Sequence, residues 1–421
     1  MPTSSSDTES TASTSVDNEV DAEVDINALQ LEIEAWLAKH WVEGVDRHEF
    51  LDAVVDAGYA TPRWAPELGG LGLASPAADT IAEAFARAGA PGAGQDLTNL
   101  WAGTLVEHAP EDLRDHLVRR LLTGRLQMCL LYSEPGAGSD LGGLQTRAEP
   151  DGAGGWIVTG QKVWTSNAPR AEYGFLLART DWDVPKRQGI SFLLLPMQQP
   201  GIDIRPIRQI TGETHFNEVF IDEAHVPSGH LLGEVGGGWR VLKTALAYER
   251  AHMGARARLP NIVGGEQAGQ STARVGDDLD LLGLAKELGS GNDPILRQDL
   301  TRIVSLQRIH HWNGQRGKDE SRLGRPSPVG ALAKLGLSRF FHQRAHVQHR
   351  LVGAEAMLDG AASNRAAVAN FMSLNAYFTS IGGGTDEIQR NIIGERVLGL
   401  PRDVEVDSGL PFREVRKAQL S

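Results

Sequence analysis

Two glycine-rich segments hold most of the side chains that could bind a flat or anionic ligand. Residues 131–140 read LYSEPGAGSD, and residues 160–167 read GQKVWTSN. Glycine lets backbone N–H groups approach a ligand closely, and short hydroxyl groups add hydrogen-bond donors. The hydroxyl groups belong to Ser133, Ser139, Thr165 and Ser166. One such loop is most often a plain turn, but the two together, with the indole of Trp164 in the second to cover an aromatic ring, predict a binding site for a flat or anionic ligand.

A carboxylate lies on an apolar helical stripe further along the chain. The stripe recurs at three- and four-residue steps, as one face of a helix does: Leu242, Ala245, Leu246, Glu249 and Met253. Burying a carboxylate on such a face is costly, so we interpret Glu249 as a candidate general base. The alternative is a surface residue that pairs with a nearby arginine. Arg250 follows directly, but it stands about 100° around the helix, so the two need not pair.

Other reactive residue types form no pattern that indicates chemistry. The thirteen histidines include helical neighbours, but no carboxylate stands at ligand spacing, and we predict no metal site. The only cysteine, Cys129, excludes an intrachain disulfide and is interpreted as a buried small residue. A phosphate loop of the Gly-x-x-x-x-Gly-Lys type is absent from the sequence.

Composition and charge narrow the class of protein. The 421 residues are 41% hydrophobic and 23% charged, which predicts a globular protein of two or three units. The net charge is -13, and residues 1–26 hold seven acidic side chains without Lys or Arg, which predicts a disordered acidic tail rather than a signal peptide. Apolar runs fall short of the ~20 residues that span a bilayer. We therefore expect a cytoplasmic protein without membrane or nucleic-acid partners.

The predicted secondary structure changes along the chain, from helices to strands and back to helices. Residues 27–127 show helical spacing and predict an N-terminal helical domain. Residues 128–235 predict a β-domain, with strands near 156–158, 173–177, 190–195, 202–207 and 215–221. Residues 236–403 predict a helical bundle, with helices after the first near 277–290, 293–316, 328–358, 361–376 and 385–398. Residues 404–421 are expected to be a loosely attached tail. The predicted fold class is α+β, with an N-terminal helical domain, a central β-barrel-like domain and a C-terminal four-helix bundle.

With the closing segment 383–399 (GGTDEIQRNIIGERVLG), these motifs resemble the acyl-CoA dehydrogenase family over about residues 27–403. The resemblance implies that the chain binds FAD and that the β-domain carries the flavin ring. It places two groups of residues against the isoalloxazine: Tyr132 and Ser133, and Trp164, Thr165 and Ser166. It places Gly138 and Ser139 at the flavin diphosphate and the thioester arm. Thr385 and Glu387 are similar to residues at a helix N-terminus that receives the adenosine half, where the helix dipole favours anions.

The resemblance also locates the catalytic base. Most members have a Glu-Gly-Thr triplet, which here reads Gly383-Gly384-Thr385. Glycine cannot accept a proton, so that arrangement is absent. Other members carry the base in a Glu-Arg motif on the helix after the β-domain, and this chain has Glu249-Arg250. Glu249 is therefore the predicted base. Arg250 either shapes the site beside it or forms a structural salt bridge.

Two departures from the family pattern concern assembly. The stretch 282–293 (LGLAKELGSGND) lacks the Arg-x-x-Phe-Gly segment that reaches a neighbouring subunit's flavin diphosphate, and residues 357–360 read MLDG instead of ending in Leu-Gly-Gly. The sequence thereby resembles a branch of actinobacterial sterol catabolism in which two unlike subunits share fewer flavins. FAD binding is then expected to depend on a partner chain, while a homodimer or homotetramer is the other arrangement found in the family.

The implied reaction is dehydrogenation of an acyl-CoA thioester to the trans-2-enoyl-CoA, with electrons passing to an electron-transfer flavoprotein. Two alternatives remain open. One is a flavin oxidase or monooxygenase of the same fold, and the other is a non-catalytic subunit that stabilises a partner. Acyl chain length and branching depend on the far end of the pocket, which the sequence does not define.

Overall fold

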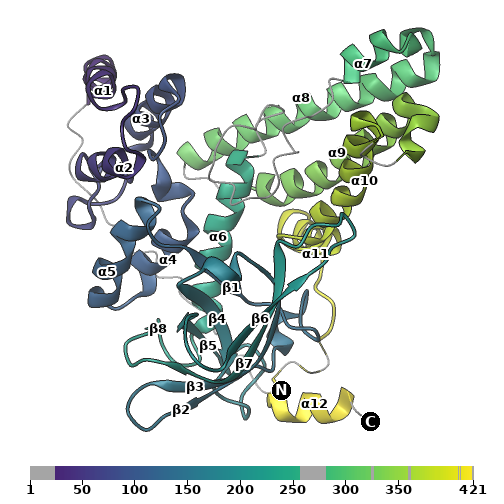
Figure 1. Ribbon diagram of the computed structural model, residues 1–421. Coiled ribbons are helices and arrows are strands. Elements are labelled where there is room, and N and C mark those ends of the chain that lie inside the picture. Colours follow the sequence, from purple (N-terminus) through teal and green to yellow (C-terminus); the bar gives the residue numbers. More distant parts are fainter. Residues whose placement is uncertain are drawn as a thin grey trace, which may run out of the picture.

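The computed structural model describes residues 24–256, 281–323, 327–358, 362–405, 407 and 409–419. A β-sheet forms the middle of the molecule, with one group of helices on each side (Figure 1). The helices that precede the sheet in sequence lie on one side, and the long helices that follow it form a bundle on the other. Helix α6 (Gly238–Arg256) follows the sheet directly and runs between these groups.

The N-terminal group contains helices α1 (Ile26–His40), α2 (Arg47–Asp56), α3 (Ser75–Ala88), α4 (Leu100–His108) and α5 (Glu111–Leu122). Three of them start at a side chain that accepts backbone N–H groups, namely Asp25, Asp46 and Asn99. Such caps satisfy donors that have no partner within the helix. Asp25 belongs to the predicted acidic tail, and residues 1–23 of that tail lie outside the described residues.

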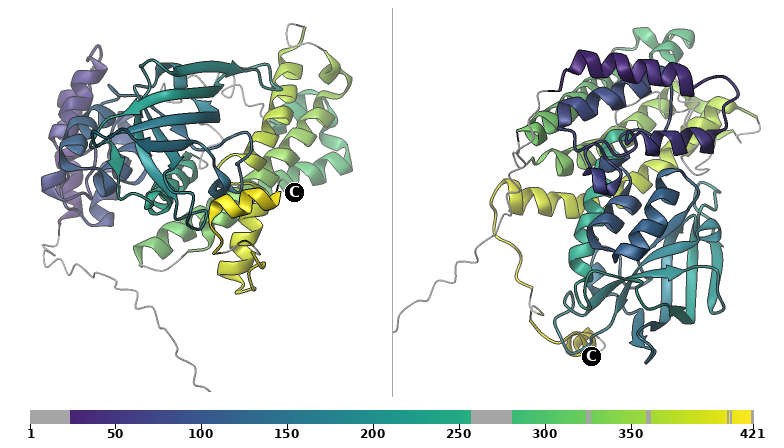
Figure 2. Two further views of the ribbon diagram at one scale, coloured as in Figure 1. Left: turned by 90° about the horizontal axis from the view of Figure 1, so that it is seen from below. Right: turned by 90° about the vertical axis from the view of Figure 1, so that its left-hand side faces the viewer.

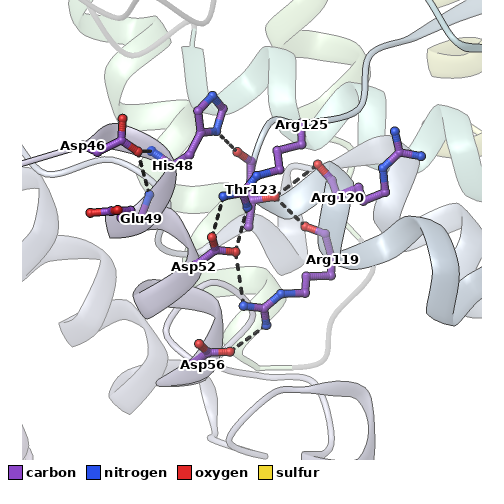
Figure 3. A network of polar contacts seen from close by, with 9 residues as sticks. All are labelled: Asp46, His48, Glu49, Asp52, Asp56, Arg119, Arg120, Thr123 and Arg125. Atoms are coloured by element: carbon purple, nitrogen blue, oxygen red, sulfur yellow. Dashed lines mark hydrogen bonds and ion pairs between the residues drawn. The ribbon is translucent and has the colours of Figure 1, made fainter.

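A polar network joins α2 to the end of α5 (Figure 3). The carboxylate of Asp52 accepts hydrogen bonds from Arg119 at 3.2 Å and from both terminal nitrogens of Arg125 at 2.7 and 2.6 Å. Arg119 also donates to Asp56 at 2.6 Å. These side chains are partly exposed, so solvent screens each pair and its net contribution to stability is small. The network fixes the orientation of the two helices more than it stabilises them.

The sheet has eight strands in the order β6-β7-β3-β2-β4-β5-β8, and β1 pairs with β4 outside this path. The strands are β1 (Met128–Leu131), β2 (Arg147–Pro150), β3 (Trp156–Ser166), β4 (Tyr173–Arg179), β5 (Ile190–Pro196), β6 (Ile202–Ile207), β7 (Phe216–Val226) and β8 (Leu231–Leu232). The predicted barrel is not closed, because β6 and β8 stand at the two ends of the path. Strand β8 has only two residues, too few to pair with a second neighbour across the opening.

The C-terminal helices are α7 (Leu281–Glu287), α8 (Pro294–Arg322), α9 (Val329–Val352), α10 (Asn364–Ile381) and α11 (Asp386–Ile392). The longest, α8, α9 and α10, lie side by side in all views (Figure 2) and share a core that includes Leu300, Ile303, Leu351 and Ala369. With α6 they form the helical bundle. The mixed α+β architecture predicted from the sequence is thus confirmed.

The end of the chain attaches to the sheet more firmly than the sequence indicated. Helix α12 (Phe412–Gln419) lies beside the β-domain, away from the bundle (Figure 1). Phe412 and Val415 are 4% and 6% exposed. The backbone N–H of Phe412 donates to the carbonyl of Val184 at 3.0 Å, in the loop between β4 and β5.

Candidate functional site

The first glycine-rich segment forms a tight turn directly after β1. The backbone groups of Glu134 and Ala137 bond to each other at 3.0 and 3.1 Å, which closes the turn. The carbonyl of Ser133 accepts from the N–H of Val163 at 2.9 Å, so the turn is tied to strand β3. This strand contains the second segment. The two motifs predicted to act together therefore lie side by side.

A buried ion pair beneath the turn escaped the sequence reasoning. The ammonium of Lys162 is fully buried and donates to Glu134 at 2.9 Å and to the carbonyl of Tyr132 at 3.1 Å. Glu134 also accepts from the backbone N–H groups of Gln145 and Thr146, at 2.6 and 2.8 Å. Along β3, Lys162 has the same inward parity as the buried Val158. This alternation along the strand was the feature of the sequence that could have indicated the burial of Lys162.

The pKa values of this pair reflect burial and mutual charge. Burial alone raises the pKa of the Glu134 carboxyl, but the charge of Lys162 and hydrogen bonds from Thr146 and Lys162 outweigh it, and the pKa lies below its usual value. Burial lowers the pKa of Lys162, and the charge of Glu134 partly opposes this effect. Both groups are satisfied by hydrogen bonds, as buried charges must be.

Strand β3 changes conformation at the second segment. Its pairing with β7 is irregular between Lys162 and Thr165, and Trp164 in between has φ 63°, an uncommon conformation for a residue other than glycine. The irregularity leaves the indole 58% exposed and 6.0 Å from the ring of Phe216. Thr165 is buried, and Ser166 is exposed. An exposed indole held in a strained backbone is typical of a ligand-contacting position.

Three buried hydroxyl groups in this region have no hydrogen-bond partner. They are the phenol of Tyr132 and the hydroxyls of Thr146 and Thr165, all shielded from solvent. Buried polar atoms in proteins are nearly always paired, so such exceptions need an explanation. A flavin, which has polar edges, would give such groups partners only if the site opened to admit it. Of the residues predicted to contact the isoalloxazine, Trp164 and Ser166 are exposed and therefore accessible to a ligand.

Helix α6 carries the predicted base, and Leu242 and Ala245 on its predicted stripe are 1% exposed. Glu249 is half-buried. Burial first, and then the negative charge of Glu249, hold the pKa of Tyr132 well above its usual value. The carboxylate predicted to be the base is thus an electrostatic neighbour of the unpaired phenol. The side chains of Arg250 and Met253 lie outside the described residues.

Contacts with α4 fix the residue before the predicted base. A Cβ on Gly103 would stand 2.3 Å from Cζ of Tyr248, so the Tyr248 ring packs directly on the α4 backbone. The Tyr248 hydroxyl donates to Glu107 at 3.0 Å, and Thr244 donates to the same carboxylate at 3.3 Å. Burial, then the charge and hydrogen bond of Glu107, raise the pKa of Tyr248. These contacts set the rotation of α6 and hence the direction of Glu249.

The segment before α11 has the backbone expected for glycine. Gly383 and Gly384 have φ 68° and 91°, a region that most side chains avoid. Thr385 caps α11 by accepting the N–H of Ile388 at 3.2 Å. Glu387 is exposed and pairs with Arg390 at 3.0 Å. The more buried acid is Asp386, which the sequence reasoning did not single out.

Asp386 links α11 to the bundle, since it accepts from Lys334 at 3.2 Å and from Ser338 at 2.8 Å. The bundle also contacts the β-domain, because the rings of Phe216 on β7 and Phe378 on α10 are 5.8 Å apart. The indole of Trp164 meets the same Phe216 ring edge-on. The turn that precedes α11 follows α10 directly, so Phe216 connects the second motif to the helix that leads into the third.

A separate cavity lies outside the predicted site. A cavity of about 320 Å³ at the start of α6 contains none of the predicted site residues and is lined by Arg187, Gln188, Glu234, Gly236, Gly237, Trp239, Arg240 and Lys243. Among the described residues, no group of three or more His, Cys, Asp or Glu side chains could hold a metal ion. None of the helices in the described ranges is long and apolar enough to cross a membrane.

Comparison with known proteins identifies three matching family domains. Residues 25–125, 129–223 and 291–398 match the N-terminal, middle and C-terminal domains of acyl-CoA dehydrogenases. The chain is 32% identical over 419 residues to the acyl-CoA dehydrogenase IpdE1 of Mycolicibacterium smegmatis, covering 91% of this chain and all of the relative.

Two solved structures share the fold. The steroid acyl-CoA dehydrogenase Tcur3481-Tcur3483 has TM-score 0.64 at 22% identity, and the match covers 90% of this chain and 98% of that chain. The ChsE4-ChsE5 complex of Mycobacterium tuberculosis has TM-score 0.63 at 24% identity, with 92% and 100% coverage. Together with the extent of the match to IpdE1, these findings show that the chain belongs to the acyl-CoA dehydrogenase family of flavoprotein oxidoreductases.

Proposed function

We propose that the protein catalyses FAD-dependent α,β-dehydrogenation of an acyl-CoA thioester to the trans-2-enoyl-CoA. The observation that carries this proposal is the proximity of a half-buried carboxylate, Glu249, to the buried and unpaired phenol of Tyr132. A reaction that removes an α-proton requires a base shielded from water. The family supplies the flavin chemistry, and no other carboxylate stands in the triplet where most members carry the base.

Glu249 removes the α-proton of the thioester in this mechanism. When bound, the flavin supplies the acceptor for the hydride that leaves Cβ. Tyr132 stays protonated at physiological pH, because its pKa lies well above the usual value. Donors aimed at developing negative charge on the thioester oxygen stabilise the transition state. Leu242 and Ala245, which are buried on the predicted stripe of α6, would form an apolar floor beside Glu249.

The cofactor is proposed to lie across the end of strand β3. Tyr132, Ser133 and the 164–166 stretch would hold the isoalloxazine, and Gly138 and Ser139 would approach the diphosphate. Both residues are exposed at the tip of the turn, and a Cβ on Gly138 would meet no atom within 4 Å. Thr385 and Glu387 would receive the adenosine half. Arg250 is proposed to shape the site beside the base.

The structural neighbours support a proposal on substrate and partners. One of them is a steroid acyl-CoA dehydrogenase, and another is a complex of two components. We propose that this enzyme accepts bulky or branched acyl groups, including sterol side chains, and that it assembles with further copies or with a related subunit. Electrons are proposed to pass to an electron-transfer flavoprotein.

The decisive experiment mixes the FAD-loaded protein with a panel of acyl-CoA esters without oxygen and follows loss of the yellow flavin absorbance. Glu249→Gln is expected to slow bleaching by about 10²- to 10⁴-fold, the usual contribution of a general base. Glu249→Asp should retain part of the rate. Glu83→Gln, at an exposed acid on α3, is the matched control and should behave as wild type.

Four results would contradict parts of the proposal. Full activity of Glu249→Gln would show that another group is the base. Steady peroxide release in air would indicate an oxidase, and incorporation of oxygen would indicate a monooxygenase. A colourless chain that gains flavin only with a second chain, and never bleaches, would indicate a non-catalytic subunit.

A further inference from the structure

The last strand residue of β4 places a guanidinium inside the protein next to the first glycine-rich segment. Arg179 is fully buried. Its guanidinium donates to three backbone carbonyls, those of Leu144 at 3.1 Å, Lys186 at 2.9 Å and Gly142 at 2.8 Å. Two of these carbonyls lie in residues 141–144, directly after the Gly138-Ser139-Asp140 tip. Arg179 therefore holds the second half of the loop in position.

The face of this guanidinium is covered by the end of the chain. Cζ of Arg179 stands 3.5 Å from the ring centroid of Phe412, the first residue of α12. Trp182 lies on the same side, with its ring 5.5 Å from that of Phe412. Burial lowers the pKa of Arg179 to about 10. A cation–π contact in such surroundings is stronger than one at the surface.

Ion pairs also connect the 138–144 loop to the end of the chain. Lys186 donates to Asp140 at 3.1 Å and to Asp407 at 3.5 Å, so it bridges the loop and the end of the chain. Arg187 pairs with Glu405 at 3.2 Å. A Cβ on Gly142 would stand 3.5 Å from carbons of both Lys186 and Arg187. The side chains of Lys186 and Arg187 thus lie between the 138–144 loop and the end of the chain and contact both.

We propose that residues 403–405, 407 and 409–419 form a C-terminal clasp that sets the conformation of the 138–144 loop and thereby retains the flavin diphosphate. Phe412, Arg179 and Asp407 are positioning residues in this device, since none of them is assigned a contact with the cofactor. The inference rests on the proposed function for the role of Gly138 and Ser139, but the contacts between clasp and loop stand without it.

The test compares four forms of the full-length protein with a chain that ends at Arg402. The four forms are wild type, Phe412→Ala, Phe412→Tyr and Leu410→Ala, the last being an exposed neighbour as the control. Two quantities are measured for each, the Kd for FAD by titration of flavin fluorescence and the hydrogen exchange of amides 141–146. Exchange needs no cofactor or substrate.

Phe412→Ala is expected to raise the Kd for FAD by about tenfold, the size of a desolvated cation–π contact, and to speed exchange in 141–146. Phe412→Tyr keeps the ring and should restore both values, and Leu410→Ala should match wild type. Unchanged exchange and Kd in Phe412→Ala would overturn the clasp, whether or not the shortened chain folds. If wild type binds no FAD at all, the proposed function fails, and exchange in 141–146 still decides whether the clasp exists.

Discussion

Lys162 and Glu134 are the charged residues on which the first binding segment depends. A buried ion pair stabilises little in net terms, but removal of one partner leaves an uncompensated charge in the interior. Here that charge would lie between the carbonyl of Tyr132 and two backbone N–H groups of residues 145 and 146. The pair therefore determines the geometry of the turn more than it determines the stability of the domain.

Lys162→Met is expected to destabilise the β-domain by about 3–5 kcal/mol, because Glu134 remains buried without its partner. Adding Glu134→Gln should recover part of that loss, since the amide carries no charge, although its single oxygen can accept from only one of the backbone N–H groups of Gln145 and Thr146. Lys39→Met, at an exposed position in α1, is the control. Urea midpoints followed by circular dichroism measure the effect. Equal losses in the single and double variants would contradict the pairing argument.

The same pair predicts a direction of pH dependence. The folded-state pKa of Glu134 lies below its usual value, so the stability it contributes is fully present above the unfolded pKa. That contribution is lost as pH falls through the folded pKa. The Lys162→Met and Glu134→Gln double variant should therefore lose less stability than wild type when urea midpoints are compared across acidic pH.

Residue types and spacing predicted the two glycine-rich segments and the candidate base. They did not predict the buried ion pair beneath the first segment. The glycines and hydroxyls of the two motifs were recognisable because they are unusual at that density, and Glu249 was recognisable because it interrupts an apolar stripe. Lys162 looked like a motif residue in a loop, since its burial depends on strand β3 continuing through the motif to Ser166. The ligand-binding roles of all these residues remain predictions.

At the scale of elements, long periodic segments were predictable and short paired ones were not. Strand β6 was predicted with its observed bounds, and the long helices α8 to α10 within a few residues. Strands β1, β2 and β8 were missed, because each has four residues or fewer and gains its partner from a distant part of the chain. Strand β1, for example, pairs with β4 across the intervening hairpin. Such pairing leaves little local pattern.

The contact between α4 and α6 predicts the effect of a substitution at Gly103. Gly103→Ala would place a methyl group 2.3 Å from the ring of Tyr248, and overpacking of this kind costs about 1–3 kcal/mol. Because Tyr248 precedes Glu249, the displacement of α6 should also reduce the dehydrogenation rate. Melting temperature and anaerobic bleaching kinetics measure the two effects.

Gly314→Ala is the matched control for that helix substitution. Gly314 also lies within a helix, α8, but a Cβ there would meet no atom within 4 Å. Alanine should therefore raise stability by up to about 1 kcal/mol through helix propensity alone. If Gly103→Ala behaved like Gly314→Ala in both measurements, the proposed role of the α4 contact in aiming Glu249 would be wrong.

For the molecule as a whole, exposed apolar residues gather around the end of α10 and the segment after α11. Their exposed fractions are large: Tyr377 62%, Ile381 65%, Leu398 66% and Leu400 55%. Where exposed apolar side chains form one patch on a monomer, the patch marks a site of association. The neighbours that share this fold include a complex of two named components, and the bundle is where the sequence departs from the family's usual contact between subunits.

We therefore expect the purified chain to migrate above its monomer mass of 45.4 kDa and to lose that association in the double variant Ile381→Glu and Leu398→Glu. Two buried carboxylates at an interface would remain unpaired, which costs several kcal/mol. Leu31→Glu is the control, because Leu31 on α1 is equally exposed, at 67%, but lies in the N-terminal group of helices. Light scattering after gel filtration, with and without FAD, gives the mass of each form. A monomeric wild-type chain under both conditions would show that this surface does not join two copies, whereas dissociation of the Leu31→Glu variant would place the contact on the other side of the molecule.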